Sequence, residues 1–413
     1  MAEYRNREIA PGPQYQIPSE LHLPRGYRYG TANCRIRGAH WQRPDVAIIA
    51  SDVPAVASVQ LTRNAVKAAP IVACAALRAR GAAGQAVIIN SGNANACTGA
   101  AGPRAVAEMQ AAAAQATGAR AEDIWVMSTG VIGRVIPEGV FASAGTTALG
   151  ADRAAVETTA RAIMTTDRWP KLYSSRIGSS SACVLGFGKG AGMINPTVAT
   201  MLVWLGTDAQ LDQATADRAL KLALDASLNR ISVDGDQSTN DTVLLFANGA
   251  SATTITSGPD FDALVAALTQ VLQGIGKSIV RDGEGSNHCI ELQISGARDD
   301  ADAARIARYL SGSQLVKTAI FGHDPNWGRI AASVGAAQPE LNPDKLRVRI
   351  GDIVVFEGGV PVANDRLKEL SQYLATQEDM LIAVDLAMGN GRAQFWTSDL
   401  GYEYVRINAD YTT

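Results

Sequence analysis

Thr200 stands where the sequence best fits a catalytic strategy that needs no histidine. A run of small residues beginning at Gly188 leads up to it, Ala199 directly precedes it, and the apolar run 201–205 follows. If the chain is cut before a threonine, that residue carries both a hydroxyl nucleophile and a free α-amine, whose pKa of about 7.7–8.0 suits it to act as the base. The small residues are expected to permit strained self-cleavage, and a strand then holds the new terminus. Taken alone the pattern is weak, because most threonines at the start of a strand are structural.

Other catalytic motifs are largely missing from the sequence. The four histidines, His22, His40, His288 and His323, include no pair at the spacing of metal ligands, so we expect no histidine-based metal site. The stretch GIGKS ends like a phosphate-binding loop, but Val271 stands where that loop needs a glycine. The glycines of GFGKGAG alternate, which is not the spacing of a dinucleotide-binding loop. No motif indicates a Ser-His-Asp triad, although sequence alone does not exclude one.

The composition indicates a globular protein with a small or neutral partner. The 413 residues include 37 basic and 40 acidic side chains, a net charge of −3 without the long basic blocks that bind nucleic acid. The five cysteines include no C-x-x-C pair, which fits a reducing compartment: Cys34, Cys74, Cys97, Cys183 and Cys289. The first residues lack a signal-peptide core, and no apolar run approaches the ~18 residues that span a bilayer. We therefore expect a cytoplasmic protein with no membrane partner.

Short β-type runs alternate with alanine-rich helical patterns in the first half of the chain. After an irregular lead-in of about 45 residues, residues 85–90 are predicted to form a buried strand. Residues 103–117 are predicted to form a helix that begins at a proline and ends before Gly118. Residues 123–127 are predicted to form the next strand, which runs into the turn STGVIG.

The alternation continues beyond Thr200. Residues 207–230 and 262–276 have a helical period, residues 289–296 read as a strand, and residues 399–413 read as a strand with a polar tail. The sequence therefore predicts an α/β fold of mixed sheets layered with helices, in two halves that meet near residue 200.

Eight sequence blocks, in order along nearly the whole chain, give a specific resemblance to a known family. They are LTRNAVKAAP, VIINSGNANACTG, STGVIG, AIMTTD, VDGDQSTNDTV, DGEG, DPNWGRI and YVRINADYTT. Together with KGAGMINPTVATML they resemble the ornithine acetyltransferases, the glutamate N-acetyltransferases of the arginine pathway. The resemblance implies the fold of that family and autocatalytic cleavage before the threonine of ATML.

The resemblance implies roles for particular residues. Thr200 corresponds to the nucleophile, and cleavage after Ala199 gives an α chain, residues 1–199, and a β chain, residues 200–413. Thr129 and Gly130 match the oxyanion hole, which fits the ability of a hydroxyl and a backbone N–H to stabilise a developing alkoxide. The residues that match substrate contacts are Thr166, Lys189, Thr200, Glu284, Asn408 and Thr413.

The implied reaction moves an acetyl group from N2-acetylornithine to glutamate through an acetyl ester on Thr200. Lys189 suits the α-carboxylate of an N-acetylated amino acid, and Glu284 suits the ammonium of an ornithine side chain. The resemblance implies no metal and no cofactor, leaves acetyl-CoA open as a second donor, and implies that both chains stay together as an α2β2 heterotetramer.

Three alternatives stay open at the level of sequence. After Glu284 the chain reads Gly-Ser-Asn-His288, where the family commonly has G-A-T-K, so a relative that acts on another N-acyl amine is one alternative. A self-cleaving amidase or peptidase with water as the acceptor is the second. A non-catalytic protein that binds anions through its glycine-rich loops is the third.

Three of the blocks have no predicted chemical role. The polar side chains of NSGNANACTG and VDGDQSTNDT are predicted to hold loops by hydrogen bonding to the nearby backbone. DPNWGR is predicted to be scaffold, with Trp327 as a packing residue.

Overall fold

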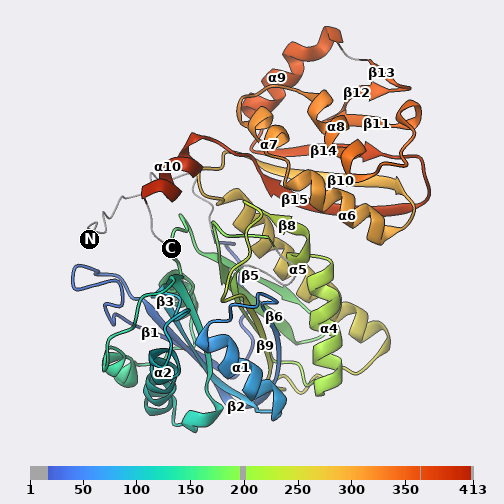
Figure 1. Cartoon of the computed structure of the whole chain (residues 1–413). Coiled ribbons are helices and arrows are strands. Elements are labelled where there is room, and N and C mark those ends of the chain that lie inside the picture. Colours follow the sequence, from blue (N-terminus) through green and yellow to red (C-terminus); the bar gives the residue numbers. More distant parts are fainter. Residues whose placement is uncertain (1–16, 196–200, 363, 411–413) are drawn as a thin grey trace. The chain divides into compact units, whose positions relative to one another are not determined.

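The computed structural model describes residues 17–195, 201–362 and 364–410, and these form two compact units (Figure 1). The first unit contains the described residues up to Asn229 together with Asp236–Gly276. The second contains Arg230–Gly235 and the described residues from Lys277 onward. This division differs from the predicted α and β chains, because residues on both sides of position 200 belong to the first unit.

The first unit contains a mixed sheet with the strand order β4-β3-β2-β9-β7-β6-β5, and β1 pairs with β2. Its strands are β1 (Tyr27–Ala32), β2 (Val46–Leu61), β3 (Gly84–Asn93), β4 (Trp125–Val131), β5 (Lys171–Arg176), β6 (Cys183–Lys189), β7 (Leu202–Thr207) and β9 (Thr242–Ala247). The long strand β2 pairs with β1 and β3 through its first part and with β9 through its last six residues. Because β2 changes partners along its length, it joins two sub-sheets.

The two sub-sheets face each other across an aromatic core. Trp204 of β7 packs edge-on against Tyr27 and Tyr29 of β1, with ring centroids 5.4 and 5.8 Å apart. Phe246 of β9 packs edge-on against Trp125 of β4 at 6.5 Å. All five rings are buried, so this core holds β1, β4, β7 and β9 in place relative to one another.

Helices cover the sheet of the first unit. They are α1 (Ala69–Ala79), α2 (Ala101–Thr117), α3 (Arg153–Ala162), α4 (Gln213–Asp225) and the residues of α5 (Gly258–Arg281) up to Gly276. A Cβ added at Gly186 of β6 would lie 2.7 Å from the Val271 side chain, and one at Gly188 would lie 3.0 Å from that of Ile275. The alternate glycines of GFGKG therefore let α5 pack directly on a buried strand.

Among the described helices, α5 is the one long and apolar enough to cross a membrane by length and composition. Of its most apolar window, 56% is buried inside the protein, as in the core helix of a globular domain. A single helix of this kind is weak evidence for a membrane span.

The second unit contains a mixed sheet with the strand order β13-β12-β11-β14-β10-β15-β8. Its strands are β8 (Ile231–Ser232), β10 (Cys289–Ala297), β11 (Arg347–Ile350), β12 (Ile353–Glu357), β13 (Val360–Pro361), β14 (Asp379–Asp385) and β15 (Gly391–Ser398). Its helices are α6 (Asp300–Ser311), α7 (Gln314–Phe321), α8 (Trp327–Ala337), α9 (Leu367–Thr376) and α10 (Tyr402–Asp410). Short 3-10 turns in the two units are Ala121–Asp123, Ala142–Thr146, Leu228–Arg230, Pro343–Lys345 and Asn364–Arg366.

The structure confirms the predicted fold class, an α/β fold of mixed sheets layered with helices. The predicted strand 85–90 is the centre of β3, and the predicted helix 103–117 is α2 with two further residues at its start. Gly118 ends α2 with a φ of 77°, as the pattern predicted.

Three predicted elements were wrong in extent or type. The lead-in contains a strand, β1, and the helix predicted over 207–230 begins only at Gln213, where the Asp212 side chain accepts a hydrogen bond from the Thr215 N–H. The stretch predicted as a final strand contains the helix α10. Its alternate aromatic residues resemble a strand pattern, but Glu403 pairs with Arg406 one turn away along the helix.

Candidate active site

Thr129 and Lys189 come together in the first unit. Thr129 lies near the end of β4, Lys189 is the last residue of β6, and the Lys189 Nζ donates a 3.3 Å hydrogen bond to the Thr129 Oγ1. Their strands are far apart in the order of the sheet. The strand β2 belongs to both sub-sheets, because it pairs with β3 in one and with β9 in the other. The two sub-sheets face each other, and this brings Thr129 and Lys189 together. The structure thus places two predicted site residues in contact.

Asp167 is the buried acid beside Lys189. Its Oδ2 lies 3.9 Å from the Lys189 Nζ, and its Oδ1 accepts hydrogen bonds of 2.7 Å from the Lys171 Nζ and from the Gly190 N–H. Burial alone raises the pKa of Asp167, but the two ammonium groups outweigh it and hold this pKa well below its ordinary value. Asp167 is therefore a fixed negative charge that holds the end of β6 in place.

Thr166 occupies the bend next to Asp167 and is half-buried. The bend is held by a 2.9 Å hydrogen bond from the Thr165 N–H to the second carboxylate oxygen of Asp167. The same Asp167 oxygen lies 3.9 Å from the Lys189 Nζ. Thr166 is therefore the sequence neighbour of a residue that lies beside the Thr129–Lys189 contact.

Gly130 has a backbone conformation that only glycine adopts easily. Its φ is 131°, and a Cβ added there would lie 2.3 Å from the carbonyl carbon of Gly92 and 2.4 Å from the nitrogen of Asn93. Because β3 approaches so closely, position 130 requires glycine. The sequence placed Thr129 and Gly130 in a turn after a strand, whereas β4 continues through both of them to Val131.

Asn240 connects two of the blocks to which sequence reasoning assigned no chemical role. Its side-chain amide donates to the backbone carbonyls of Ala94, at 2.6 Å, and Ser128, at 2.9 Å. Ser128 in turn donates to the Asn90 side chain at 2.5 Å. VDGDQSTNDT and NSGNANACTG thus have a structural role, as predicted, but these hydrogen bonds join distant segments and not the nearby backbone.

Asp241 is a residue near the site that sequence reasoning did not single out. It directly precedes β9, and β9 runs parallel to β7 with Thr242 opposite Leu202. The Thr242 N–H donates to the Met201 carbonyl at 3.0 Å, so Asp241 lies beside Met201. No signal in the sequence could have found this neighbour, because parallel strand pairing over some 40 residues leaves no local pattern.

The carboxyl group of Asp241 is buried. Burial raises the pKa of Asp241 well above its ordinary value, although the nearby side chains of Ser238 and Thr62, the ammonium of Lys189 and the backbone of Met201 oppose the shift.

Glu284 and Asn408 come together in the second unit. The Asn408 Nδ2 donates a 2.9 Å hydrogen bond to the Glu284 Oε2 and a 3.0 Å bond to the Tyr404 carbonyl of its own helix, α10. A Cβ at Gly285 would lie 2.4 Å from the Tyr404 nitrogen, so this glycine lets α10 lie against the DGEG loop. Two predicted substrate contacts, 124 residues apart in sequence, are therefore neighbours.

The departure Ser286-Asn287-His288 is part of the scaffold. The buried His288 ring places its Nδ1 2.8 Å from the Asp399 Oδ2 and its Nε2 3.0 Å from the Leu374 carbonyl. The Ser286 hydroxyl and the Asn287 N–H also donate to Asp399. The His288 side chain thus interacts with Asp399 inside the second unit.

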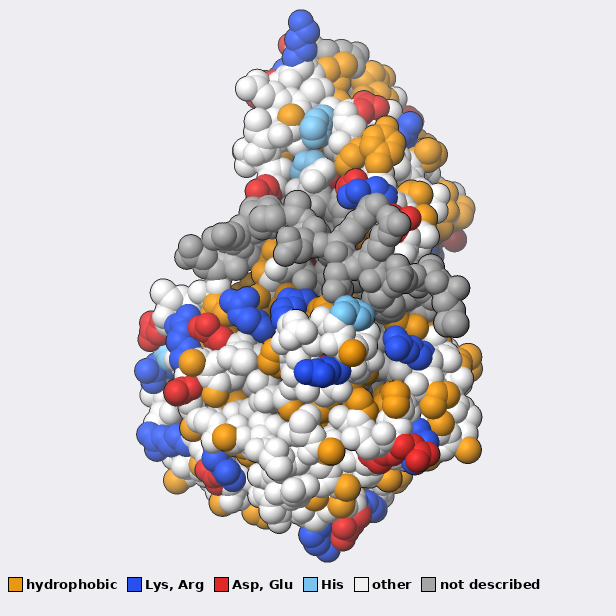
Figure 2. Space-filling view, turned by 90° about the vertical axis from the view of Figure 1, so that its left-hand side faces the viewer, with side chains coloured by type: hydrophobic (Ala, Val, Ile, Leu, Met, Phe, Trp, Pro, Cys, Tyr) orange, Lys and Arg blue, Asp and Glu red, His pale blue; other side chains and the backbone are white. Residues whose placement is uncertain are grey.

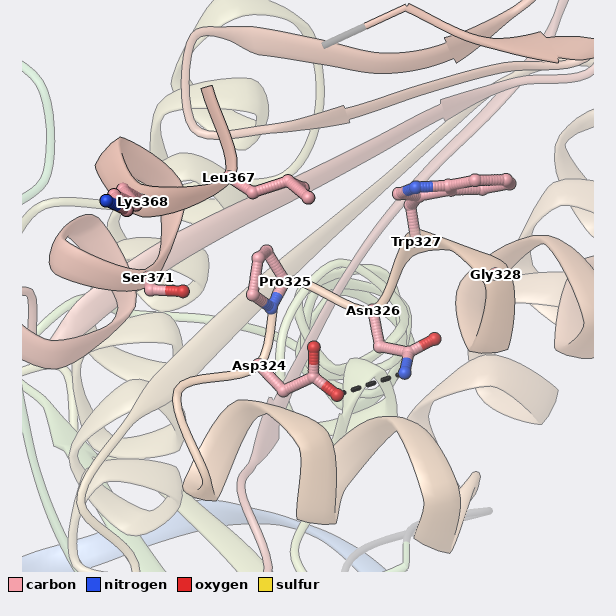
Figure 3. Close-up of a pocket in the computed structure, with 8 residues that line it drawn as sticks. All are labelled: Asp324, Pro325, Asn326, Trp327, Gly328, Leu367, Lys368 and Ser371. Carbon is pink, nitrogen blue, oxygen red and sulfur yellow. Dashed lines mark hydrogen bonds between the residues drawn. The ribbon is translucent and has the colours of Figure 1, made fainter. Parts of the chain in front are cut away.

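The DPNWGR block lines a pocket of about 600 Å³ in the second unit (Figure 3). Its lining residues are Asp324, Pro325, Asn326, Trp327, Gly328, Leu367, Lys368 and Ser371. Trp327 stacks on Phe356 with the ring centroids 5.1 Å apart, and Asp324 accepts a 3.0 Å hydrogen bond from Asn326. Trp327 is therefore a packing residue, as predicted.

Three residues named in the sequence analysis, Ala199, Thr200 and Thr413, lie outside the described residues. Within the described part of the chain, no group of three or more His, Cys, Asp or Glu side chains could hold a metal ion. On the face of the first unit seen in Figure 2, basic side chains are interspersed with acidic and uncharged ones.

Comparison with known proteins identifies the family. The sequence profile of the ArgJ family matches residues 28–413. The chain belongs to the ArgJ family. It is 42% identical over 395 residues to the "Arginine biosynthesis bifunctional protein ArgJ" of Geobacter sulfurreducens, with 94% of this chain and 99% of that protein covered.

Solved structures of ArgJ relatives are also similar to parts of the chain. The ArgJ crystal structure from Bacillus halodurans is 40% identical, with 49% of this chain and 96% of that chain covered and a TM-score of 0.48. The ornithine acetyltransferase of Mycobacterium tuberculosis, solved in complex with ornithine, is 32% identical, with coverages of 43% and 94% and a TM-score of 0.36. Membership in the ArgJ family confirms the predicted family and enzyme class, an acetyltransferase of arginine biosynthesis.

Proposed function

We propose that this ArgJ chain cleaves itself between Ala199 and Thr200 and then transfers the acetyl group of N2-acetylornithine to glutamate through an acetyl ester on Thr200. The observation that carries the proposal is the contact between Lys189 and Thr129. The Thr129 hydroxyl accepts from Lys189, so its own proton remains to be donated to another oxygen. A hydroxyl held in this way suits an oxyanion hole.

The cleavage step makes the catalytic base. The Thr200 hydroxyl adds to the Ala199 carbonyl and loses its proton, the peptide nitrogen takes up a proton, and the C–N bond breaks to leave an ester. Water then hydrolyses the ester to release the Ala199 carboxylate. The β chain now begins with Thr200, which carries the free α-amine that the transfer step needs.

The transfer step follows a ping-pong order. The α-amine takes the proton of the Thr200 hydroxyl, which attacks the acetyl carbonyl while the Thr129 hydroxyl and the Gly130 N–H stabilise the oxyanion. The proton passes to the leaving nitrogen, and ornithine departs. The amine of glutamate then attacks the acetyl ester, N-acetylglutamate departs, and the Thr200 hydroxyl is restored.

The remaining predicted substrate contacts keep their roles in the proposal. Lys189 supplies a cation for the α-carboxylate, and Thr166 directly precedes Asp167, whose carboxylate lies 3.9 Å from the Lys189 Nζ. Glu284 supplies a carboxylate for the ornithine ammonium, and its partner Asn408 orients it. Thr413 is included on family resemblance alone.

Strand order gives a reason for the cleaved chains to stay together. Both β7 and β9 belong to the β chain, while their outer neighbours β6 and β2 belong to the α chain. Each of these two junctions has six paired residues. Cleavage would therefore leave the first unit as one sheet built from both chains, and we propose a cytoplasmic α2β2 enzyme.

Intact-mass and N-terminal analysis of the purified protein tests the cleavage. We expect two fragments, the second beginning Thr200-Met201-Leu202, and one uncut chain for Thr200→Ala. A Thr200→Ala chain that still splits at this bond would overturn the proposal.

An assay of the cleaved protein tests the transfer. With N2-acetylornithine and glutamate we expect ornithine and N-acetylglutamate in equal amounts, and replacing the donor with acetyl-CoA shows whether a second donor is used. Release of free acetate without any acceptor would indicate a hydrolase instead.

A further inference from the structure

Asp399 is a buried acid of the second unit that the proposed reaction does not use. It is 3% exposed, it directly follows β15, and α10 begins three residues later at Tyr402. That helix carries Asn408, whose side chain donates to Glu284. A short piece of backbone therefore joins Asp399 to one of the two predicted substrate contacts in this unit.

The carboxyl group of Asp399 holds the segment that follows the other contact, Glu284. Its Oδ1 accepts hydrogen bonds from the Ser286 hydroxyl at 2.8 Å, the Asn287 N–H at 2.9 Å and the His288 N–H at 3.2 Å. Its Oδ2 lies 2.8 Å from the His288 Nδ1. Since Glu284 stands only two residues before Ser286, one side chain fixes the end of the loop that presents Glu284.

The His288 ring ties the same loop to α9. Its Nε2 lies 3.0 Å from the Leu374 carbonyl, and a carbonyl oxygen can only accept a hydrogen bond. Both ring nitrogens thus face oxygens, those of Asp399 and Leu374, and one proton lies in each of the two hydrogen bonds. The ring is buried and held at both ends, so the loop has little freedom to shift.

Asp399 is itself held in place by α7. The Lys317 Nζ donates to the carbonyl of Ser398 and, at 3.1 Å, to its hydroxyl. The Lys317 carbonyl accepts the Leu400 N–H at 3.3 Å. Both chain neighbours of Asp399 are therefore bonded to one buried residue, which gives the loop a rigid anchor.

Gly285 brings this anchored loop against α10. A Cβ at Gly285 would lie 2.4 Å from the Tyr404 nitrogen and 2.8 Å from the Glu403 carbonyl carbon, so loop and helix meet backbone to backbone. The position of the Glu284 carboxylate beside Asn408 therefore depends on where the loop is held.

We propose that Asp399 is a positioning residue that places the Glu284 carboxylate for the ammonium of N2-acetylornithine and so sets the preference for a donor with a charged side chain. The inference deepens the proposed function and rests on it. A charge-assisted hydrogen bond needs a distance of about 2.7–2.9 Å between its heavy atoms, so a small displacement of Glu284 weakens the pairing. Asp399 acts through Glu284 and does not touch the substrate.

A pair of donors that differ in one group tests the inference. N2-acetylnorvaline has the carbon chain of N2-acetylornithine but lacks its terminal ammonium. The ratio of kcat/KM for acetylornithine to that for acetylnorvaline isolates the contribution of the ammonium, because a general loss of activity lowers both values equally. Asp399→Ala should lower this ratio by about 10-fold, as Glu284→Gln should. A wild-type ratio in Asp399→Ala would overturn the inference.

A double variant separates positioning from independent damage. If Asp399 acts through Glu284, Asp399→Ala combined with Glu284→Gln should have the ratio of Glu284→Gln alone. Two effects that multiply would overturn the inference and leave the proposed function intact. A wild-type ratio in Glu284→Gln would instead overturn the role of Glu284 in the proposed function, and the inference would fall with it.

Gln338→Ala is the matched control for a loosened second unit. Gln338 is also buried and polar, and its side chain accepts from Arg298 at 3.0 Å and donates to Asp302 at 2.8 Å. We expect it to lose stability and keep the wild-type ratio. A drop equal to that of Asp399→Ala would overturn the inference.

Two conservative changes complete the test. Asp399→Asn keeps an oxygen for the Ser286 and Asn287 donors and should restore the ratio to within about 3-fold of wild type. A ratio as low as that of Asp399→Ala would contradict these hydrogen bonds as the means of positioning. If Asp399→Ala fails to fold, Asp399→Glu takes its place, because one extra methylene at this buried position displaces the loop while the charge stays. The same outcomes then decide.

Discussion

The Nζ of Lys189 lies 3.3 Å from the Oγ1 of Thr129, although their strands are separated by four others in the order of the sheet. The contact depends on the change of partners along β2, which brings the two sub-sheets face to face. It joins a cation suited to a carboxylate with a hydroxyl suited to an oxyanion. The first prediction follows from this contact.

Lys189→Met should lower kcat/KM for acetyl transfer by about 10²–10³-fold, because the Thr129 hydroxyl loses its partner and the substrate carboxylate loses its cation. Steady-state assays of the cleaved variant measure the loss. Lys171→Met is the matched control, since Lys171 also pairs with Asp167 but through the Oδ1, whereas Lys189 lies beside the Oδ2. We expect Lys171→Met to lose stability while it keeps most of its activity, and an equal loss of activity in both variants would contradict the assigned role of Lys189.

Gly130→Ala should abolish cleavage or slow it by at least about 10²-fold, because a Cβ would collide with the backbone of Gly92 and displace Thr129. Intact mass over time measures the loss. Gly118→Ala is the control, since Gly118 also has a positive φ but a Cβ there meets no atom within 4 Å. That variant should lose about 1 kcal/mol of stability and cleave normally.

Local patterns in the sequence predicted several of the elements but not the contacts between them. The helix that ends at Gly118 follows from its own residues. Gly188 began the stretch that was predicted to be mobile, whereas Gly188 and Gly186 both belong to a buried strand that packs under α5. A glycine allows either flexibility or close packing, and only the neighbouring helix decides which.

The resemblance to a family predicted site residues that the spacing of residue types could not. Thr129 and Lys189 are 60 residues apart, and Glu284 and Asn408 are 124 apart. Neither pair has a local signature, because both contacts arise from long-range pairing of strands or docking of a helix. Neither the spacing of residue types nor the family resemblance predicted that Asp241 lies near the site.

Glu284→Gln should raise the KM for N2-acetylornithine by about 10-fold, because the neutral amide no longer pairs with the ornithine ammonium. The half-reaction with glutamate, measured by loss of the acetyl group from isolated acetyl-enzyme, should change little. Asn408→Asp keeps the size of the partner but places a second carboxylate beside Glu284 in place of a donor. We expect it to weaken donor selectivity as well, and an unchanged KM for the donor in Glu284→Gln would contradict the assignment.

Lys317 should make the stability of the second unit depend on pH. It is buried and donates to the carbonyls of Val233, at 2.8 Å, and Ser398. Burial lowers its pKa from 10.5 to about 8, although Asp399 and Asp234 oppose the shift. Between these two values the unfolded chain binds the proton and the folded chain does not, so stability rises with pH across this window.

Lys317→Met should remove that rise and leave two carbonyls without their donor. We expect a loss of about 1–3 kcal/mol at pH 7.5, and a deficit larger by about 2 kcal/mol at pH 9.5, where the wild type has gained stability. Hydrogen exchange of β15 peptides at both pH values measures the difference. Deprotonation of the buried thiols lowers the stability of both proteins at high pH, so this contribution cancels when the two proteins are compared. Lys345→Met, at an exposed position of the same unit, should show no such change, and a deficit in Lys317→Met that is the same at both pH values would contradict the prediction.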